Sequence, residues 1–423
     1  MSILRHIRFA KKINPNAGAA KGAGRKGRAF TLLELIIVIA VVSVLASAAA
    51  IIINPAEILA EARDAERISD ARLLYQNISL LKNSNPRTFF GSQKTVYISL
   101  PDDAGVSCPS HPGLPSLPSD WSYRCAPSFS FREVGGSGWI PANLLSISGG
   151  SPISSLPIDS DNTSASGRYY MYIPDGLAFA VAPESVKHLR GTATRDGGYD
   201  FIRYEVGKDL SVFAIINRLA GIWSFEEAGS SAGADSGISG NNGVVFGSPS
   251  AVAGVSGSAI SFDGIDDYIR VANQTGDTFS ISFWLKAASS LTGVACSAGS
   301  GLISSDIQGV GNDFSVTLVN GHICFFTGNP DESVEGVKNV ADSAWHHIVV
   351  GRERGGFKNI YVDGALDRVG LAGNNVLNNN QNIEFGTSTV TGKYFNGSLD
   401  EVVVYNRILS PAEISALYNS GAK

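Results

Sequence analysis

The sequence is poor in charge. Charged residues make up 17% of its 423 positions, against about 25% in average soluble proteins. Hydrophobic residues reach 44% and the formal net charge is only -5, which excludes intrinsic disorder as the main state of the chain. The chain also has no basic excess, which is the usual mark of a nucleic-acid-binding protein. We therefore expect folded domains and no nucleic-acid partner.

The few charges are unevenly distributed. Residues 1–29 hold eight of the 33 Lys and Arg and no Asp or Glu, so the rest has 25 basic against 38 acidic residues, a charge of -13. An apolar run, Phe30 to Ile53, follows this basic leader. As a helix it would be about 36 Å long, enough to cross a hydrocarbon core of about 30 Å. Because basic residues that flank a membrane helix are retained on the cytoplasmic side, we predict that this helix spans the inner membrane once and that the later residues lie outside.

An ordinary secretory signal is the alternative. Its cleavage site would fall among the small residues Ala46 to Ala50. The apolar region of such a signal is normally about 7–15 residues long, however, and the run found here is longer. We therefore favour a retained membrane helix.

A single carboxylate, Glu34, interrupts the apolar run. An unpaired charge there costs a few kcal/mol, so a partner is expected unless Glu34 lies at the headgroups. The basic leader, Ala29 and the following Phe-Thr-Leu-Leu-Glu resemble a type IV prepilin, although that family usually has glycine in place of Ala29. The resemblance implies that a prepilin peptidase cuts before Phe30 and methylates its amine. Glu34 would then pair with the N-terminus of a neighbouring pilin subunit during assembly.

A second helical pattern follows Pro55, which should end or kink the first helix. Apolar residues recur at helical spacing: Ile58, Ala62, Ala65, Ile68, Tyr75 and Ile78. Asp64, Arg67 and Asp70 stand three residues apart, which favours weak ion pairs on an exposed face. We predict a hydrophobic and then amphipathic helix over residues 30–83. Its charges are expected to face solvent, with contacts between subunits as the alternative.

Residues 84–218 change character. Pro, Ser and Gly clusters separate short strand-like runs, namely Val96–Ser99, Tyr169–Ile173, Ala178–Ala182 and Phe201–Glu205. The Leu-Pro-Ile-Asp turn ending at Asp159, and the tyrosine-rich run after it, resemble the head of pilins and pseudopilins. That resemblance implies a small antiparallel sheet packed on the long helix. Some pseudopilins bind calcium here, and Asp159, Asp161 and Asn162 offer oxygens, although these are also ordinary turn residues.

The chain has only four cysteines, which allow three pairings. Export makes disulfides plausible, and closeness in sequence favours Cys108 with Cys125 and Cys296 with Cys324. No other Cys or His stands at a metal-ligand spacing from either pair, so we predict disulfides rather than a metal site or a catalytic thiol.

Residues 219–423 read as alternating strands between Gly, Asn and Ser turns. In segment 279–286, one predicted face comprises Phe279, Ile281, Phe283 and Leu285, and the other Ser280, Ser282, Trp284 and Lys286. An Asp-Gly turn at Asp363 predicts a hairpin. Such runs without interleaved helices predict a two-sheet sandwich.

Five motifs in this region share an order with a known family. They are Ile222–Glu227, Ile260–Ile269, Phe279–Lys286, Trp345–Val350 and Phe395–Ser410. Together with a final helix that Ser410 should cap, they resemble the concanavalin A-like, laminin G-type jelly roll. The resemblance implies binding of carbohydrates or protein surfaces, often with calcium at the rim.

Candidate ligand residues follow from that resemblance. Trp284 is the candidate for stacking on a sugar ring, although tryptophans of a sandwich more often belong to its core. Asp235, Asn241 and Asn242 offer hard oxygens for Ca²⁺ at a loop tip, against an ordinary turn.

Glycosidases of this architecture usually carry a Glu-x-Asp-x-Glu pattern, which is absent from the sequence. Three adjacent pairs, Glu226–Glu227, Asp266–Asp267 and His346–His347, are poor acid/base pairs because neighbours on a strand point to opposite faces. We therefore expect a binding protein and not an enzyme.

The predicted fold is an α+β pilin-like region, with a long N-terminal helix and a small antiparallel sheet, followed by an all-β jelly-roll sandwich. Its parts are the leader 1–29, the helix 30–83, the head 84–218 and the jelly roll 219–423. We predict a minor or tip subunit of a type IV pilus or related filament, bearing a module that binds carbohydrate or a protein on another cell. The alternatives are a monomeric membrane-anchored glycan-binding protein, a secretion pseudopilin and a glycoside-processing enzyme.

Overall fold

The computed structural model describes residues 31–227, 229–306, 312–328, 332–377, 382–388 and 392–421. The predicted leader and the two predicted cleavage residues, Ala29 and Phe30, lie outside these ranges. The chain divides into two compact units, residues 1–55 and residues 56–423. Each unit is described by itself.

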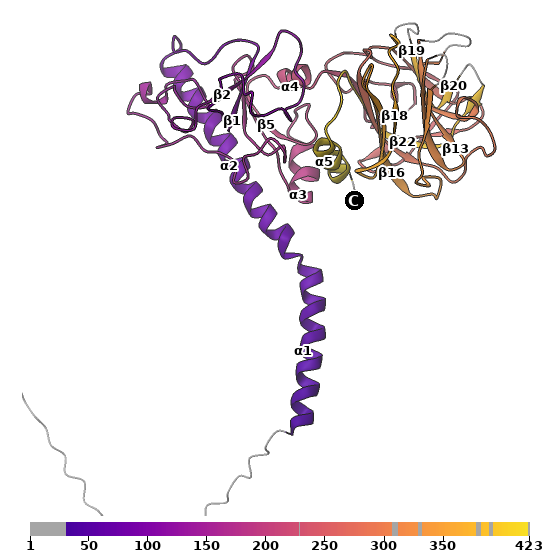
Figure 1. The fold of residues 1–423 in the computed structure, drawn as a ribbon, viewed down its shortest axis with the longest axis horizontal. Coiled ribbons are helices and arrows are strands. Elements are labelled where there is room, and N and C mark those ends of the chain that lie inside the picture. Colours follow the sequence, from indigo (N-terminus) through magenta and orange to yellow (C-terminus); the bar gives the residue numbers. More distant parts are fainter. Residues whose placement is uncertain are drawn as a thin grey trace, which may run out of the picture. The chain divides into compact units, whose positions relative to one another are not determined.

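The first unit contains helix α1, Leu32–Ile53 (Figure 1). Thr31 caps it, and Asn54 ends it in the left-handed conformation with φ 42°. Helix α2 begins at the next residue, Pro55, which has no N–H to continue a helix. The predicted interruption at Pro55 is therefore confirmed. Among the helices in the described ranges, none has both the length and the apolarity needed to cross a membrane.

Helix α2, Pro55–Ser84, opens the second unit and lies against the head sheet (Figure 1). The sheet order is β2-β1-β3-β4-β5. Its strands are β1 (Thr95–Pro101), β2 (Ser122–Ala126), β3 (Met171–Ile173), β4 (Ala178–Val181) and β5 (Tyr204–Val206). The antiparallel pairing of β1, β3, β4 and β5 agrees with prediction, but β2 runs parallel to β1. The connection through residues 102–121 supplies the crossover that a parallel pair needs.

The head core is aromatic. Trp139, Tyr170, Tyr172 and Phe179 pack against a stripe on α2 made by Ile68, Ala71, Leu74, Ile78 and Leu81. The predicted stripe was wrong in its first half, because Ile58 is 52% exposed and Ala62 and Ala65 are also exposed. That stretch of the helix instead buries Asp64 and Arg67.

Short helices complete the head. They are a 3₁₀ turn (Leu144–Ser146), α3 (Val186–His188), a π-helical turn (Leu189–Ala193) and α4 (Ser211–Ile216). The two disulfides pair as predicted, Cys108 with Cys125 in the head and Cys296 with Cys324 in the sandwich, with Cα atoms 5.3 and 5.7 Å apart.

The C-terminal part is a sandwich of two sheets (Figure 1). One sheet has the order β15-β14-β13-β12-β19-β10-β7 and the other β18-β17-β16-β11-β22-β9-β8, with β6 also paired to β22. The first comprises β7 (Val244–Phe246), β10 (Tyr268–Ala272), β12 (Ser300–Ser304), β13 (Phe314–Val319), β14 (His322–Thr327), β15 (Glu332–Glu335) and β19 (Asn382–Phe385). The second comprises β6 (Leu219–Trp223), β8 (Ser250–Ala253), β9 (Ser258–Asp263), β11 (Phe279–Lys286), β16 (Trp345–Arg352), β17 (Phe357–Val362), β18 (Ala365–Leu371) and β22 (Asn396–Tyr405). A two-stranded ribbon, β20 (Thr387–Ser388) and β21 (Lys393–Tyr394), forms a small sheet of its own beside β12.

Strand β11 is buried on both faces. Its predicted apolar face, Phe279 to Leu285, lies in the core between the sheets. The opposite face is buried as well, because Ser280, Ser282 and Trp284 are at most 5% exposed. Helix α5, Pro411–Gly421, contributes Ile414 and Leu417 to a second cluster on this outer face, together with Ile202 of the head. The head and the sandwich therefore share a packed boundary.

Candidate functional site

Glu34 lies in the first turn of α1. Its Oε2 accepts hydrogen bonds from the backbone N–H of Thr31, at 2.9 Å, and from the Thr31 hydroxyl, at 3.0 Å. In return the Glu34 N–H donates to the Thr31 hydroxyl at 3.2 Å, which completes a capping box. No ion pair to Glu34 occurs within the described residues. The carboxylate is thus held in the first turn of α1, and the predicted N-terminal residue, Phe30, lies outside the described residues.

A buried ion network joins α2 to the head. The Arg67 guanidinium donates through Nε and Nη2 to Asp159, at 2.6 and 2.9 Å, and through Nη1 to Asp64, at 2.7 Å. Arg67 is 2% exposed and both partners are fully buried. Asp70 instead accepts from the Tyr170 hydroxyl at 2.9 Å. The prediction that these charges face solvent was therefore wrong for Asp64 and Arg67, since residues from the head cover them.

The predicted calcium group at Asp159 is occupied by protein contacts. Besides Arg67, Asp159 accepts the N–H of Asp161. Asp161 pairs with Arg168 at 3.1 Å, and Asn162 bonds Ser99 through both amide atoms. These three residues fix the turn onto α2 and the sheet.

The loop at Asp235 brings its three predicted calcium ligands together, but their oxygens already accept hydrogen bonds from the protein. Asp235 accepts four bonds, from the N–H groups of Ile222, Gly237 and Asn241 and from the Ser239 hydroxyl, which matches the acceptor capacity of a carboxylate. The Asn242 oxygen accepts the Asp235 N–H, and the Asn241 oxygen accepts the Ala272 N–H. Burial raises the Asp235 pKa, but these bonds outweigh it and leave the pKa lowered. The loop is organised by its own bonds.

A different group could supply part of a metal shell. Across the described ranges, one set of three such side chains converges, namely Asp263, Asp266 and Asp267, whose ligand atoms lie within 4.8 Å of one another. Asp263 and Asp266 are exposed, while Asp267 is buried and accepts the N–H groups of Ser248 and Asp263. Calcium takes six to eight oxygens, so these carboxylates would be only part of a site. The sequence signal for this group is the Asp-Gly-Ile-Asp-Asp run from Asp263 to Asp267, in which three carboxylates fall within five residues.

Trp284 is almost completely buried on the outer face of the sandwich. It is 5% exposed, and its ring centroid lies 5.8 Å from that of Tyr418 on α5 in a stacked arrangement and 5.1 Å from His347. Trp223 is 1% exposed and packs edge-on against Phe385 at 5.0 Å. Packed side chains cover the Trp223 ring, whereas Trp284, although only 5% exposed, lines a cavity at the outer face of the sandwich.

The adjacent residues His346 and His347 lie in different environments. His346 bonds Asp363 at 2.9 Å and Asp342 at 3.1 Å, which together raise its pKa against the effect of burial. His347 is 2% exposed, and burial lowers its pKa to about 3. The two rings point to different partners, in agreement with the predicted structural role.

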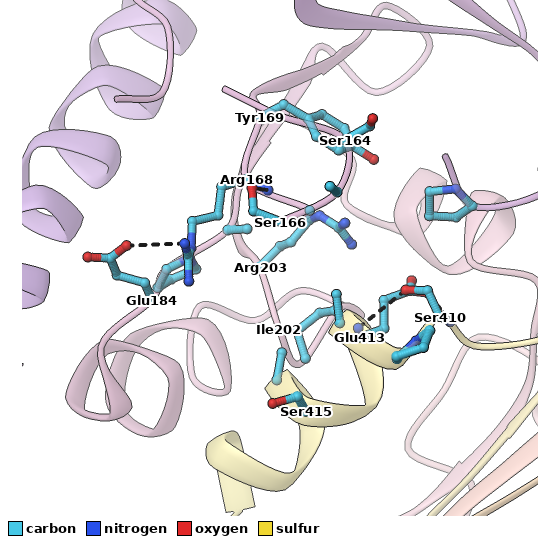
Figure 2. Close-up of a pocket in the computed structure, with 18 of the residues that line it drawn as sticks. Ser164, Ser166, Arg168, Tyr169, Glu184, Ile202, Arg203, Ser410, Glu413 and Ser415 are labelled. Carbon is cyan, nitrogen blue, oxygen red and sulfur yellow. Dashed lines mark hydrogen bonds and ion pairs between the residues drawn. The ribbon is translucent and has the colours of Figure 1, made fainter. Parts of the chain in front are cut away.

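A cavity of about 510 Å³ lies where α5 meets the head (Figure 2). Arg168, Tyr169, Glu184 and Arg203 line it from the head, and Ser410 from the start of α5. In Figure 2, Arg168 points to Glu184, with 3.5 Å between Nη1 and Oε2. This cavity could not be predicted from local sequence patterns, because the head and α5 segments that line it are far apart in the chain.

The start of α5 fixes the boundary between head and sandwich. The Ser410 hydroxyl accepts the Glu413 N–H at 3.3 Å, and Glu413 accepts the Ser410 N–H at 2.9 Å, so the predicted cap is confirmed. Glu413 also receives both terminal nitrogens of Arg407, at 3.0 and 2.7 Å. Arg407 Nε in turn donates to the Asn217 carbonyl of the head.

Acid is expected to weaken this boundary. Burial alone raises the Glu413 pKa, but Arg407 outweighs burial and lowers it to about 2 from 4.5. A lowered carboxyl pKa gives stability that is present above pH 4.5 and is lost as pH falls towards 2, on the order of 3 kcal/mol for this pair. Urea unfolding at pH 5 and pH 2.5 measures the loss. Glu413→Gln should be less stable than the natural protein at pH 5 and show a shallower pH dependence; equal pH dependence would contradict the assignment.

Comparison with known proteins supports both resemblances. Residues 24–50 match the prokaryotic N-terminal methylation motif, and residues 263–415 match the concanavalin A-like lectin/glucanases superfamily. The chain thus carries a prepilin-type N-terminus and a concanavalin A-like jelly roll. Adhesion G-protein coupled receptor V1 of Danio rerio is 26% identical over 150 residues, which are 34% of this chain and 2% of the receptor.

Two solved structures are similar over 48% of this chain. One is domain 4 of an extracellular arabinanase from Geobacillus stearothermophilus, in complex with arabinotriose, with 19% identity, a TM-score of 0.40 and 98% of that chain covered. The other is the binding domain of Paraclostridial Mosquitocidal Protein 1, with 17% identity, a TM-score of 0.39 and 52% covered. The jelly-roll assignment rests on the strand order and on the family match.

Proposed function

We propose that this protein is a minor or tip subunit of a type IV pilus or related filament, and that its jelly roll binds carbohydrate or a protein on another cell. The observation that carries the proposal is the N-terminal methylation motif on the same chain as a concanavalin A-like domain. Glu34 stands four positions after Phe30, where the resemblance requires the assembly carboxylate. The large sandwich favours a rare or terminal subunit over a closely packed major one.

In this proposal the precursor enters the inner membrane through residues 30–53, and a prepilin peptidase removes the leader between Ala29 and Phe30. Neighbouring pilin subunits then pack through the N-terminal helices, and the sandwich reaches the cell surface. We propose binding rather than hydrolysis as its activity. The buried ion pairs of Arg67, and the hydrogen bond from Arg407 to the Asn217 carbonyl, support a head that stays attached to both the helix and the sandwich.

Mass spectrometry of the mature protein tests the filament role. Protein from sheared filaments should begin with N-methylated Phe30 and lack the leader. An intact leader, or a protein confined to the membrane and missing from sheared filaments, would instead indicate a membrane-anchored monomer. Removing the prepilin peptidase from the same cells is the control, because it should restore the leader.

A glycan array tests the binding role. Signals should appear with the full chain in detergent, and repeating the array with calcium and with a chelator tests the predicted cofactor. Hydrolysis of a bound glycan that is lost on changing a single carboxylate would contradict a pure binding function.

A further inference from the structure

A second cavity, of about 190 Å³, lies between the head and the outer face of the sandwich. Ser282, His347 and Glu401 line it from the strands, and Arg190 and Arg195 line it from the head. The family match covers residues 263–415, so two thirds of the lining residues come from outside it. At about 30 Å³ per water molecule, this volume corresponds to about six waters, which suits one small ligand rather than a chain.

A backbone irregularity places Glu401 in the wall of this cavity. The register between β11 and β22 shifts between Ser282 and Trp284, which leaves Glu401 in a bulge. Its φ is 48°, in the left-handed region, where a residue other than glycine costs about 1–3 kcal/mol. Such strain is found preferentially at functional sites. The left-handed conformation of Glu401 directs its carboxyl group towards the cavity.

The charges that act on the Glu401 carboxyl are negative, since no ion pair is found between it and Arg190 or Arg195 of the same cavity wall. Within the described residues, no hydrogen bond or ion pair reaches its side chain, and its N–H donates to Asp400. Burial first, and then the charges of Asp400 and Glu226, raise the Glu401 pKa to about 8. Burial likewise raises the Asp400 pKa to about 7. Because the pKa values of both carboxyl groups are raised, a cation bound in the cavity would stabilise their ionised forms.

The rest of the wall offers hydrogen bonds. The Ser282 hydroxyl and His347 Nε2 lie 2.9 Å apart, and Arg190 uses its Nε on the Asn419 carbonyl at 3.2 Å, which leaves its terminal nitrogens as donors. Hydroxyl oxygens of a sugar are suitable acceptors for these groups. An ammonium group suits the acidic end, since it can donate to Glu401 and offset the charges of Asp400 and Glu226.

We propose that this cavity binds one amine-bearing sugar unit, with its ammonium group on Glu401 and its hydroxyls towards Ser282 and Arg190. The proposal rests on the carbohydrate-binding function proposed above and names the chemical class of one ligand. The ligand sits on both the head and the sandwich, so it would also tighten their contact.

Calorimetric titration of the full chain in detergent tests the proposal with three sugars of one size, glucosamine, N-acetylglucosamine and glucose. Glucosamine should bind, and the two sugars without an ammonium group should bind at least tenfold more weakly. Glu401→Gln removes the charge at constant shape and should lower glucosamine affinity at least tenfold. Glu227→Gln, at an exposed acid outside the cavity, should leave it unchanged.

Thr194→Phe provides a second variant, because it narrows the cavity from the head side without touching the bulge, and it should also abolish binding. Equal binding of glucose and glucosamine, no glucosamine binding, or binding that survives both variants would overturn the proposal. If glycan-array signals persist in Glu401→Gln, the protein binds carbohydrate elsewhere and the proposal for this cavity is wrong. An array without any signal would remove the carbohydrate function together with the site.

Discussion

Replacing Arg67 with methionine is expected to destabilise the head by about 3–5 kcal/mol, the usual cost of removing one partner from a buried ion pair. The change leaves Asp64 and Asp159 buried without their shared cation, and both are fully buried in the structure. Asp64 also accepts the N–H groups of Glu184 and Ser185, so the loss should loosen this loop as well. We expect the head to unfold at lower denaturant concentration than the sandwich.

Fluorescence of the head can follow that transition, since Trp139 is 1% exposed within the head core. Arg67→Lys should lose less, because a lysine keeps the charge but cannot bind a carboxylate with two parallel bonds. Arg87→Ala is the matched control, because Arg87 is exposed and follows α2. A loss for Arg67→Met no larger than for Arg87→Ala would show that the network does not stabilise the head.

Replacing Glu34 with glutamine is expected to leave leader cleavage intact and to reduce incorporation into filaments by roughly 60- to 300-fold. The estimate assumes that the N-terminal amine of a neighbouring subunit is left unpaired in the membrane, which costs about 2.5–3.5 kcal/mol. Each 1.4 kcal/mol corresponds to a tenfold change in the equilibrium between membrane and filament. Glutamine can still accept the bonds from Thr31 that cap α1. Loss of helix capping therefore does not explain the expected effect.

Incorporation is measured as the ratio of protein in sheared filaments to protein in the membrane fraction. Glu66→Gln removes an exposed carboxylate on α2 and should assemble normally. If the Glu34→Gln protein enters filaments as efficiently as the Glu66→Gln protein, this chain does not use the assembly mechanism of the family it resembles.

Local patterns predicted most of the secondary structure. The alternation in β11 correctly placed Phe279 and Leu285 in the core, and Pro55 correctly marked the end of α1. These features depend on neighbouring residues, whose preferences the sequence shows directly. The parallel strand β2 depends on a long crossover, and no local pattern indicated its direction.

The buried polar groups could not be predicted in the same way. Asp64 and Arg67 have the spacing of a surface ion pair, and the site is buried because Asp159, 92 positions away, and the Glu184–Ser185 segment cover it. Trp284 likewise stands on a strand face that would be open without α5 and Tyr418. Glu401 becomes a cavity residue only because a bulge interrupts the pairing of β22. In each case the decisive contact comes from a distant segment.

Strand β6 bears on how the protein would carry mechanical load. The chain passes from the head into the sandwich at Leu219 and immediately forms β6, which pairs with the central strand β22 through Trp223, Ile222 and Gly221. A pull along β6 would load these hydrogen bonds in parallel, as a shear, so that several must break together. A ligand held by the sandwich would therefore be anchored to the helix through the most resistant direction of a sheet, without a flexible tether between them.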